Sequence, residues 1–353
     1  MVFSVTIYLL TFLTSIAFCK IYKRIKSKKI MTILIILPAV LIAALRYNVG
    51  MDYKNYYDLF YYIGRHIHSF NEILAYYIEP LYVVINVICF KITGSFPILL
   101  FVLEFIFCYY IIKTIVYYSN EYGISIALAY FIFLITLYHF SYNGIRQAIA
   151  VAIIFSGYKY IFNKQFKKYI LIVILASLFH TSALLCVFLY FVWNKNCSNN
   201  QKKYYTLVII STVLMPMIFL GIKIIIEKFN IYKYYLSLNT NISFGFLLYL
   251  LPVVFILLLN RKNTEINELY LFMSRLFVLQ FPLQMLGNLI KYSDRLALYV
   301  VPSQFVLLPI FIKNSKDNKK SKLLLVICWY IFYYSIMYIY LNSNGVYPYN
   351  WII

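Results

Sequence analysis

The chain has 353 residues, of which 63% are hydrophobic and only 12% are charged. A soluble domain of this size needs more polar surface than this composition supplies, so a soluble protein is excluded. The formal net charge of +21 would suggest nucleic acid for a soluble protein. Here the lysines fall in short loops between apolar runs, where the positive-inside rule explains them, so no nucleic-acid partner is predicted.

Apolar runs of about 17 to 22 residues recur along the chain, each long enough to cross a bilayer as a helix. The sequence therefore predicts an all-α fold, a polytopic transmembrane helical bundle of about 10–12 membrane segments in one integral-membrane domain, residues 1–353. The predicted full spans are 2–19, 30–45, 97–117, 124–140, 147–162, 204–222, 243–260, 268–289, 295–312 and 323–342.

Two apolar segments do not fit a single crossing. Residues 79–93 are short, and residues 169–193 are long for one span but short for two. We favour a model in which 79–93 dips into the membrane without crossing and 169–193 forms a broken hairpin with His180 near its tip. In the alternative, both segments cross the membrane. This also gives a consistent number of crossings, but it moves the lysines of 163–168 to the outer side.

The basic residues give an orientation. In the favoured model the cytoplasmic loops are 20–29, 163–168, 194–203, 260–268 and 313–322, and they hold nineteen basic residues, of which two are arginine. The outer segments hold nine basic residues, of which four are arginine: Arg46, Arg65, Arg146 and Arg295. Arginine grips phosphate or carboxylate through two N–H groups, so the outer face is predicted to hold an anion. The main outer loops are 46–78, with an amphipathic interfacial segment, and 223–241.

The first candidate site lies in "ALRYNVGMDYKNYYDLF", residues 44–60. Arg46 ends the second span, and Gly50 permits a turn that brings Asp52 back toward it. Tyr53 and Tyr56 follow, and their rings are expected to stack on sugars. The alternative is an arginine paired with an aspartate at a helix end, followed by the tyrosines of an interfacial belt.

The second candidate is "HFSYNGIRQAIAVA", residues 139–152, in which Arg146 and Gln147 open the span that follows Gly144. A cation at a helix N-terminus opposes the helix dipole unless an anion is shared there. Together with Asn143 and free backbone N–H groups, this arrangement predicts a phosphate site.

The third candidate is His180 in "ASLFHTSALL", residues 176–185. An ionisable group at membrane depth is a functional candidate, although a buried histidine can also be an ordinary hydrogen-bonded core residue. The fourth is "KYSDRLALY", residues 291–299, which places Asp294 and Arg295 at another outer helix start, either as part of the site or as a surface pair. The chain has no Asp-x-Asp, HExxH, G-x-S-x-G or Walker motif and no clustered Cys and His, so we predict neither a metal nor a cofactor.

These stretches together resemble the EpsG family of polysaccharide polymerases, which are similar in role to Wzy O-antigen polymerases. The resemblance runs in order from about residue 40 to the C-terminus, and two departures from the family pattern are Met51 and Asn350. The stretches on which the resemblance rests are "LRYNVGMDYKNYY", "IEPLY", "FSYNGIRQAIA", "ASLFHTSALL", "DRLALY" and "GVYPYNWII".

The resemblance implies a glycosyltransferase in the bacterial inner membrane with its active site on the outer, periplasmic side. Such an enzyme transfers a growing glycan from undecaprenyl diphosphate to the sugar end of a lipid-linked repeat unit, in the synthesis of O-antigen, capsule or exopolysaccharide. It also implies a GT-C-like architecture. The implied partners are undecaprenyl-diphosphate-linked glycans and membrane lipids, with a chain-length regulator of the same pathway as a further candidate.

Within that activity, we expect Arg146 and Arg295 to bind the donor diphosphate. We favour Asp52, oriented by Arg46, as the base that takes the acceptor proton, and His180 remains the competing candidate. The other outward acids, Asp58, Glu72, Glu79 and Glu227, receive no role. The alternative functions are an O-antigen ligase or acyltransferase, and a lipid-linked oligosaccharide flippase or transporter, although the repeat symmetry typical of transporters is not evident.

Overall fold

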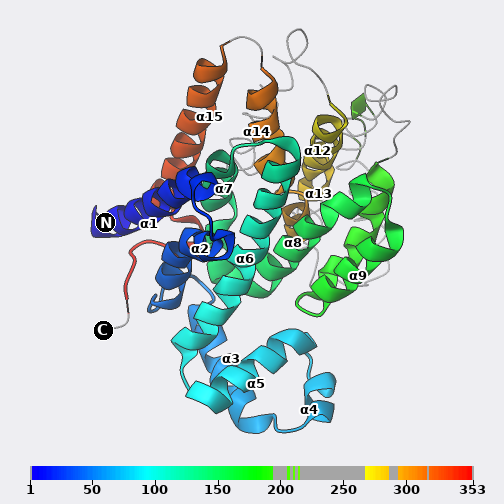
Figure 1. The fold of residues 1–353 in the computed structure, drawn as a ribbon. Helices are drawn as coiled ribbons and strands as arrows, with labels where there is room; N and C mark the ends of the chain where they lie inside the picture. Colours follow the sequence, from blue (N-terminus) through cyan, green and yellow to red (C-terminus); the bar gives the residue numbers. More distant parts are fainter. Residues whose placement is uncertain are drawn as a thin grey trace.

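The computed structural model describes residues 2–193, 205–206, 210, 214, 267–285, 293–315 and 318–351, and these are folded into helices without a strand (Figure 1). The expected all-α bundle is therefore confirmed. The main helices are α1 Val2–Ile21, α2 Lys28–Ala44, α3 Tyr53–His66, α4 Phe70–Ala75, α5 Pro80–Thr93, α6 Phe96–Tyr122, α7 Ile126–Thr136, α8 Ser141–Phe162, α9 Phe166–Ser177, α12 Glu268–Val278, α13 Gln280–Met285, α14 Ser303–Asn314 and α15 Lys319–Tyr334.

Four helical segments among the described residues are long and apolar enough to cross a membrane: Val2–Arg24, Phe96–Tyr122, Ile126–Phe162 and Lys319–Tyr340. A fifth forms if the 3₁₀ helix η7, Ser293–Tyr299, and α14 make one span bent by 43°. At 17 residues, α2 is nearly as long. The predicted spans 204–222 and 243–260 and the predicted outer loop 223–241 lie outside the described residues, apart from isolated positions.

The centre of the bundle consists of α6, α7 and α8, with α2 packed across α6 and α9 packed against α8 (Figure 1). From Ala148 to Phe155, every residue of α8 is fully buried. In a membrane an apolar helix can face lipid or other helices, and the complete burial of these residues shows that other helices enclose this part of α8.

The segment 169–193 forms the expected broken hairpin. Helix α9 ends at Ser177, His180 is extended, and the 3₁₀ helix η3, Thr181–Val192, returns along α9. The Tyr169 hydroxyl donates to the Cys186 carbonyl at 2.7 Å, and the Phe166 and Tyr190 rings lie 4.8 Å apart. These contacts pair positions on either side of a turn centred near Leu178, and His180 follows that turn at the tip of the hairpin.

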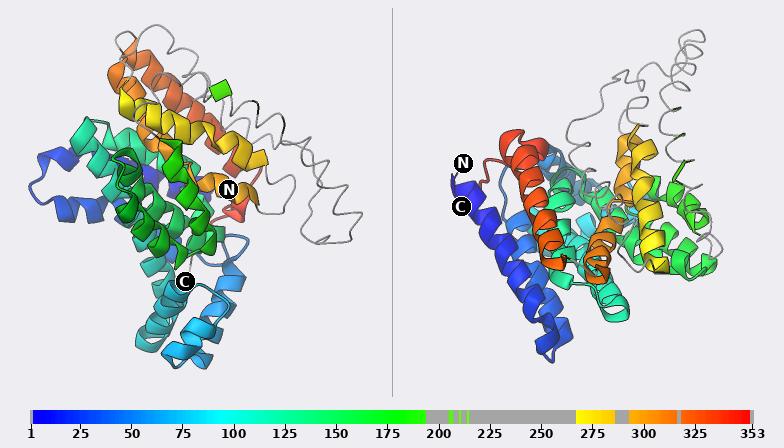
Figure 2. Two further views of the ribbon diagram at one scale, coloured as in Figure 1. Left: turned by 90° about the vertical axis from the view of Figure 1, so that its right-hand side faces the viewer. Right: turned by 90° about the horizontal axis from the view of Figure 1, so that it is seen from above.

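Helices α3, α4 and α5 form a lobe that projects from the rest of the bundle (Figures 1 and 2). Helix α3 is amphipathic, as expected for the segment 46–78, because it buries Tyr56 and Phe60 and exposes Lys54 and Asp58. A Cβ atom at Gly64 would lie 2.1 Å from the Phe90 ring, so glycine permits the close approach of α3 and α5. Helix α5 has 14 residues. At about 1.5 Å per residue this is too short for one crossing.

Several basic loops meet at one end of the bundle. Lys313 Nζ donates to the Tyr122 carbonyl at 2.6 Å, and the Tyr122 and Phe162 rings lie 6.4 Å apart. Lys20 and Lys313 line one cavity. The loops 20–29, 163–168 and 313–322 therefore converge where α6 and α8 end, and we call this the basic end. The opposite end, where α6 and α8 begin, is the site end.

Candidate functional site

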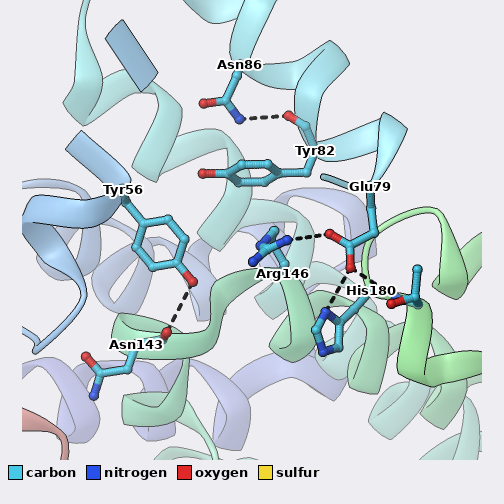
Figure 3. Close-up of polar contacts among 8 residues, drawn as sticks. Tyr56, Glu79, Tyr82, Asn86, Asn143, Arg146 and His180 are labelled. Carbon is cyan, nitrogen blue, oxygen red and sulfur yellow. Dashed lines mark hydrogen bonds and ion pairs between the residues drawn. The ribbon is translucent and has the colours of Figure 1, made fainter. Parts of the chain in front are cut away.

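The carboxylate of Glu79 is the centre of a polar cluster at the site end (Figure 3). Its Oε2 accepts a hydrogen bond from Arg146 Nη1 at 2.5 Å, and its Oε1 lies 3.1 Å from His180 Nδ1. The backbone N–H of Thr181 donates to the same Oε1 at 3.1 Å. The contact with Arg146 is an ion pair, and the contact with His180 becomes one when the imidazole is protonated.

Three separate segments bring this cluster together. Glu79 occupies the position before α5, whose first residue is Pro80, and proline favours the first helical position because it needs no N–H partner there. His180 comes from the tip of the α9–η3 hairpin, and the Leu81 N–H donates to the Leu178 carbonyl at 3.1 Å, joining the start of α5 to that tip. Arg146 comes from the start of α8.

The start of α8 is shaped by Gly144, as the sequence indicated. Its φ of −134° and ψ of 46° interrupt the helix two residues before Arg146. A Cβ atom there would lie 2.4 Å from the Phe140 ring, so glycine accommodates this ring where a larger residue would displace it. Behind it, Ser141 donates to the buried carboxyl of Glu104 at 3.1 Å and fixes the preceding turn.

Electrostatics keep Glu79 ionised. Burial alone would raise the pKa of its carboxyl, but the hydrogen bond from His180, the charge of Arg146 and backbone N–H donors outweigh burial and lower the pKa to about 2. An ionised carboxylate only accepts hydrogen bonds, so Nδ1 of His180 carries the proton that points to Glu79. In a neutral imidazole, Nε2 is then an unprotonated acceptor.

Arg146 and His180 reach the surface, whereas Glu79 does not. Their side chains are 28% and 27% exposed, against 7% for Glu79. The Arg146 guanidinium also lies over the Tyr82 ring, 5.6 Å from its centre. The Arg146 guanidinium and the His180 imidazole thus face outward, and the Glu79 carboxylate is buried behind them. A substrate would contact the two outward groups.

The first predicted motif lies beside this cluster, held by Asn143. The Asn143 Oδ1 accepts a hydrogen bond from the Asp52 N–H at 3.4 Å. The Asn143 backbone carbonyl accepts one from the Tyr56 hydroxyl at 3.1 Å (Figure 3). The Asn143 Nδ2 donates to the Asn344 carbonyl at 2.9 Å, in the C-terminal segment. Gly50, with φ of +96°, makes the turn that allows this approach. The structure therefore brings the segments around residues 50, 143 and 344 together. In this arrangement the Asn143 side chain joins the segments through hydrogen bonds and is not directed into an open phosphate site.

The expected pairing of Arg46 with Asp52 is wrong. Arg46 is 1% exposed, its Nη1 donates to the Ala43 carbonyl at 3.0 Å, and its guanidinium stacks on Tyr142 at 4.2 Å. A β-bridge between Arg46 and Trp351 covers it. The residue is buried because the C-terminal segment folds over it, and in this arrangement it reaches neither Asp52 nor a substrate. Asp52 itself is partly exposed at the start of α3.

The two tyrosines expected to stack on sugars are buried instead. Tyr53 is 6% exposed and packs edge-on against Phe96, with ring centres 5.4 Å apart. Tyr56 is 8% exposed and directs its hydroxyl to the α8 backbone. Their apolar bodies join the lobe to α6 and α8, which is a packing role.

The fourth motif also reaches the site end. Gln147, one residue after Arg146, donates through Nε2 to the Arg295 carbonyl at 3.0 Å. On the same helix η7, the Tyr299 hydroxyl and Ser182 Oγ lie 2.9 Å apart, which ties η7 to the His180 hairpin. Asp294 and Arg295 are both partly exposed. The predicted partners Arg146 and Arg295 thus lie on neighbouring segments.

Sequence reasoning considered Glu79 but gave it no role. A signal was present, because Glu79 belongs to "IEPLY", one of the stretches that carried the family resemblance. Its partners are 67 and 101 residues away, so its spacing to them holds no periodic pattern. Among the described residues, no group of three or more His, Cys, Asp or Glu is arranged to hold a metal ion.

A family model described as the EpsG family matches residues 29–351, which is nearly the whole chain. The match includes Glu79, Arg146 and His180. No curated protein and no solved structure matches the chain. The GT-C-like architecture therefore stays a prediction.

Proposed function

The chain belongs to the EpsG family, and from that premise we propose that it is a lipid-linked repeat-unit polymerase of a bacterial surface polysaccharide. The observation that carries the proposal is the placement of Glu79 between Arg146 and His180. This cluster offers an anion-binding group and a base side by side. These are the two groups that transfer of a glycan from a lipid diphosphate requires.

In the proposed reaction, a hydroxyl of the acceptor sugar attacks the anomeric carbon of the growing glycan. The new glycosidic C–O bond forms as the C–O bond to the undecaprenyl diphosphate breaks. The proton of the hydroxyl passes to Nε2 of His180, and the diphosphate leaves as an anion. No nucleotide enters, because the diphosphate is already the leaving group.

We assign the base to His180 rather than to Asp52 or Glu79. Both oxygens of Glu79 accept hydrogen bonds, and its pKa of about 2 makes it a poor proton acceptor near neutrality. Glu79 instead orients the imidazole and stabilises the imidazolium that forms, as a carboxylate does for a histidine base in other enzymes. Asp52 lies beside Asn143 and becomes a candidate contact for the acceptor sugar.

Arg146 is the proposed diphosphate ligand. One of its N–H groups is used by Glu79, and a guanidinium has five, so others remain to bind a phosphate. Arg295 is the second proposed ligand, because its backbone is bonded to Gln147 beside Arg146. Positive charge at the leaving group stabilises the negative charge that develops there.

The separation of the basic end from the site end supports the proposed orientation. Lysine-rich loops are typical of the cytoplasmic side, so the site end would face outward, where lipid-linked repeat units are exposed in this proposal. The proposed location is accordingly the outer face of the bacterial inner membrane. A chain-length regulator is a proposed partner only.

The test is reconstitution of the purified full-length chain in liposomes with undecaprenyl-diphosphate-linked repeat units. We expect a ladder of lengthened glycans, each still attached to the lipid. Transfer of single units to a different acceptor would indicate a ligase. Movement of units across the membrane without lengthening would indicate a flippase, and either result would overturn the proposal.

A further inference from the structure

A cavity of about 450 Å³ lies at the basic end, far from the Glu79 cluster. It is bounded by the end of α1, the loop between α6 and α7, the end of α14 and the start of α15. Its volume falls within the range of pockets that bind small molecules. The proposed reaction uses none of its residues.

The described lining of this cavity is both basic and apolar. Four lysines line it, and no acidic residue does: Lys20, Lys23, Lys313 and Lys319. The rest of the wall is mostly apolar and includes Ile126, Leu128 and Leu323. The positive-inside rule accounts for lysines in these loops, but it does not require two separate loops to place their lysines around one apolar cavity.

One of the four lysines is held in place. Lys313 Nζ donates to the Tyr122 carbonyl at 2.6 Å. Gly123 has a φ of +65°, and a Cβ atom there would lie 2.9 Å from this Nζ, so the glycine leaves room for the ammonium. An ammonium has three N–H groups, and the bond to Tyr122 uses one. The charge is therefore positioned before any ligand arrives.

We propose that this cavity binds the phosphate headgroup of an anionic phospholipid from the leaflet around the basic end. Lysines offer compact positive charges that suit a phosphate, and basic pockets between membrane helices are suited to anionic headgroups. The apolar wall beside Ile126 and Leu323 receives the first part of an acyl chain. The bound lipid links α1, α7, α14 and α15, and so stabilises the bundle on the side opposite the reaction.

The experiment compares two double variants that remove equal charge from the same two loops. Lys23→Gln/Lys319→Gln changes lysines that line the cavity, and Lys26→Gln/Lys320→Gln changes exposed neighbours that do not line it. Purified protein in detergent is titrated with phosphatidylglycerol or phosphatidylcholine. Bound lipid is counted by native mass spectrometry, and the shift in thermal midpoint is measured in parallel.

We expect wild type to bind one phosphatidylglycerol in preference to phosphatidylcholine, with a saturable rise in the thermal midpoint. The cavity variant should bind it about tenfold more weakly, and the control variant should remain within about twofold of wild type. Ala127→Trp, which fills the cavity without changing charge, should also weaken binding.

Three results would overturn the proposal. Equal loss in both double variants would mean that only the net charge of the loops matters. Equal binding of phosphatidylcholine, which carries the same phosphate but no net headgroup charge, would mean that the site does not select an anionic phospholipid. Competition by soluble glycerol phosphate as strong as that by the lipid would mean that the ligand is not a membrane lipid.

Discussion

The Oε1 atom of Glu79 lies 3.1 Å from Nδ1 of His180, although the two residues are 101 positions apart in the chain. This contact fixes which imidazole nitrogen carries the proton, and it leaves the other nitrogen to act on a substrate. Removing the carboxylate should therefore affect the reaction through the histidine.

The first prediction is that Glu79→Gln polymerises at least roughly a hundredfold more slowly than wild type, since an amide neither fixes the tautomer nor stabilises the imidazolium. The loss should fall mainly on kcat and less on KM, measured with the reconstituted protein. Glu72→Gln is the matched control, because Glu72 is an exposed acid of the same lobe. Equal rates for Glu79→Gln and wild type would remove Glu79 from the mechanism.

The second prediction concerns the planar guanidinium group of Arg146. Arg146→Lys keeps the positive charge but loses the bidentate geometry, so we expect roughly a hundredfold less polymer at a normal protein level. Arg65→Lys is the control, since Arg65 is exposed on α3 away from the cluster. If Arg146→Lys makes polymer of wild-type length, Arg146 only holds Glu79 in place and does not bind the diphosphate.

The third prediction separates the two candidate bases. His180→Gln should lower turnover by about 10² to 10⁴, the usual contribution of a general base. Asp52→Asn should retain most of the activity, because Asp52 lies outside the cluster and an asparagine can still hydrogen-bond an acceptor sugar. Both variants are assayed with lipid-linked repeat units. If Asp52→Asn is inactive and His180→Gln is active, Asp52 and not His180 is the general base.

The local motifs were predictable because each breaks an apolar pattern. His180, flanked by Thr181 and Ser182, interrupts a long apolar run and stands at the hairpin tip, and Gly144 interrupts α8 where expected. The partnerships were not predictable. Asp52 and Arg46 are close in sequence, yet the C-terminal segment buries Arg46, while Glu79 finds partners that only the tertiary fold brings near. One sequence holds no signal for such long-range contacts.

The fourth prediction is a pH dependence of stability. The folded-state pKa of Glu79 is about 2, below its ordinary value of 4.5, so its ion pairs stabilise the fold above pH 4.5 and lose this effect as the pH falls toward 2. The thermal midpoint of wild type should exceed that of Glu79→Gln near neutrality, and the gap should narrow below pH 4.5. Glu121→Gln, at an exposed acid of α6, should show no such gap. A gap that is constant with pH would show that Glu79 acts without its charge.

The fifth prediction concerns the two ends of the bundle. Tyr57 lies on the lobe and is 42% exposed, whereas Lys167 is exposed at the basic end. If lysine-rich loops face the cytoplasm, a cysteine at Tyr57 should react with an impermeant thiol reagent added to intact cells, and a cysteine at Lys167 should react only after the membrane is permeabilised. The variants are made in a chain with Cys197 and Cys328 changed to serine, since Cys328 is exposed. Labelling of Lys167→Cys but not of Tyr57→Cys in intact cells would place the Glu79 cluster on the cytoplasmic side. The proposed reaction on outward-facing lipid-linked units would then fail, because its base and its diphosphate ligand would face the wrong compartment.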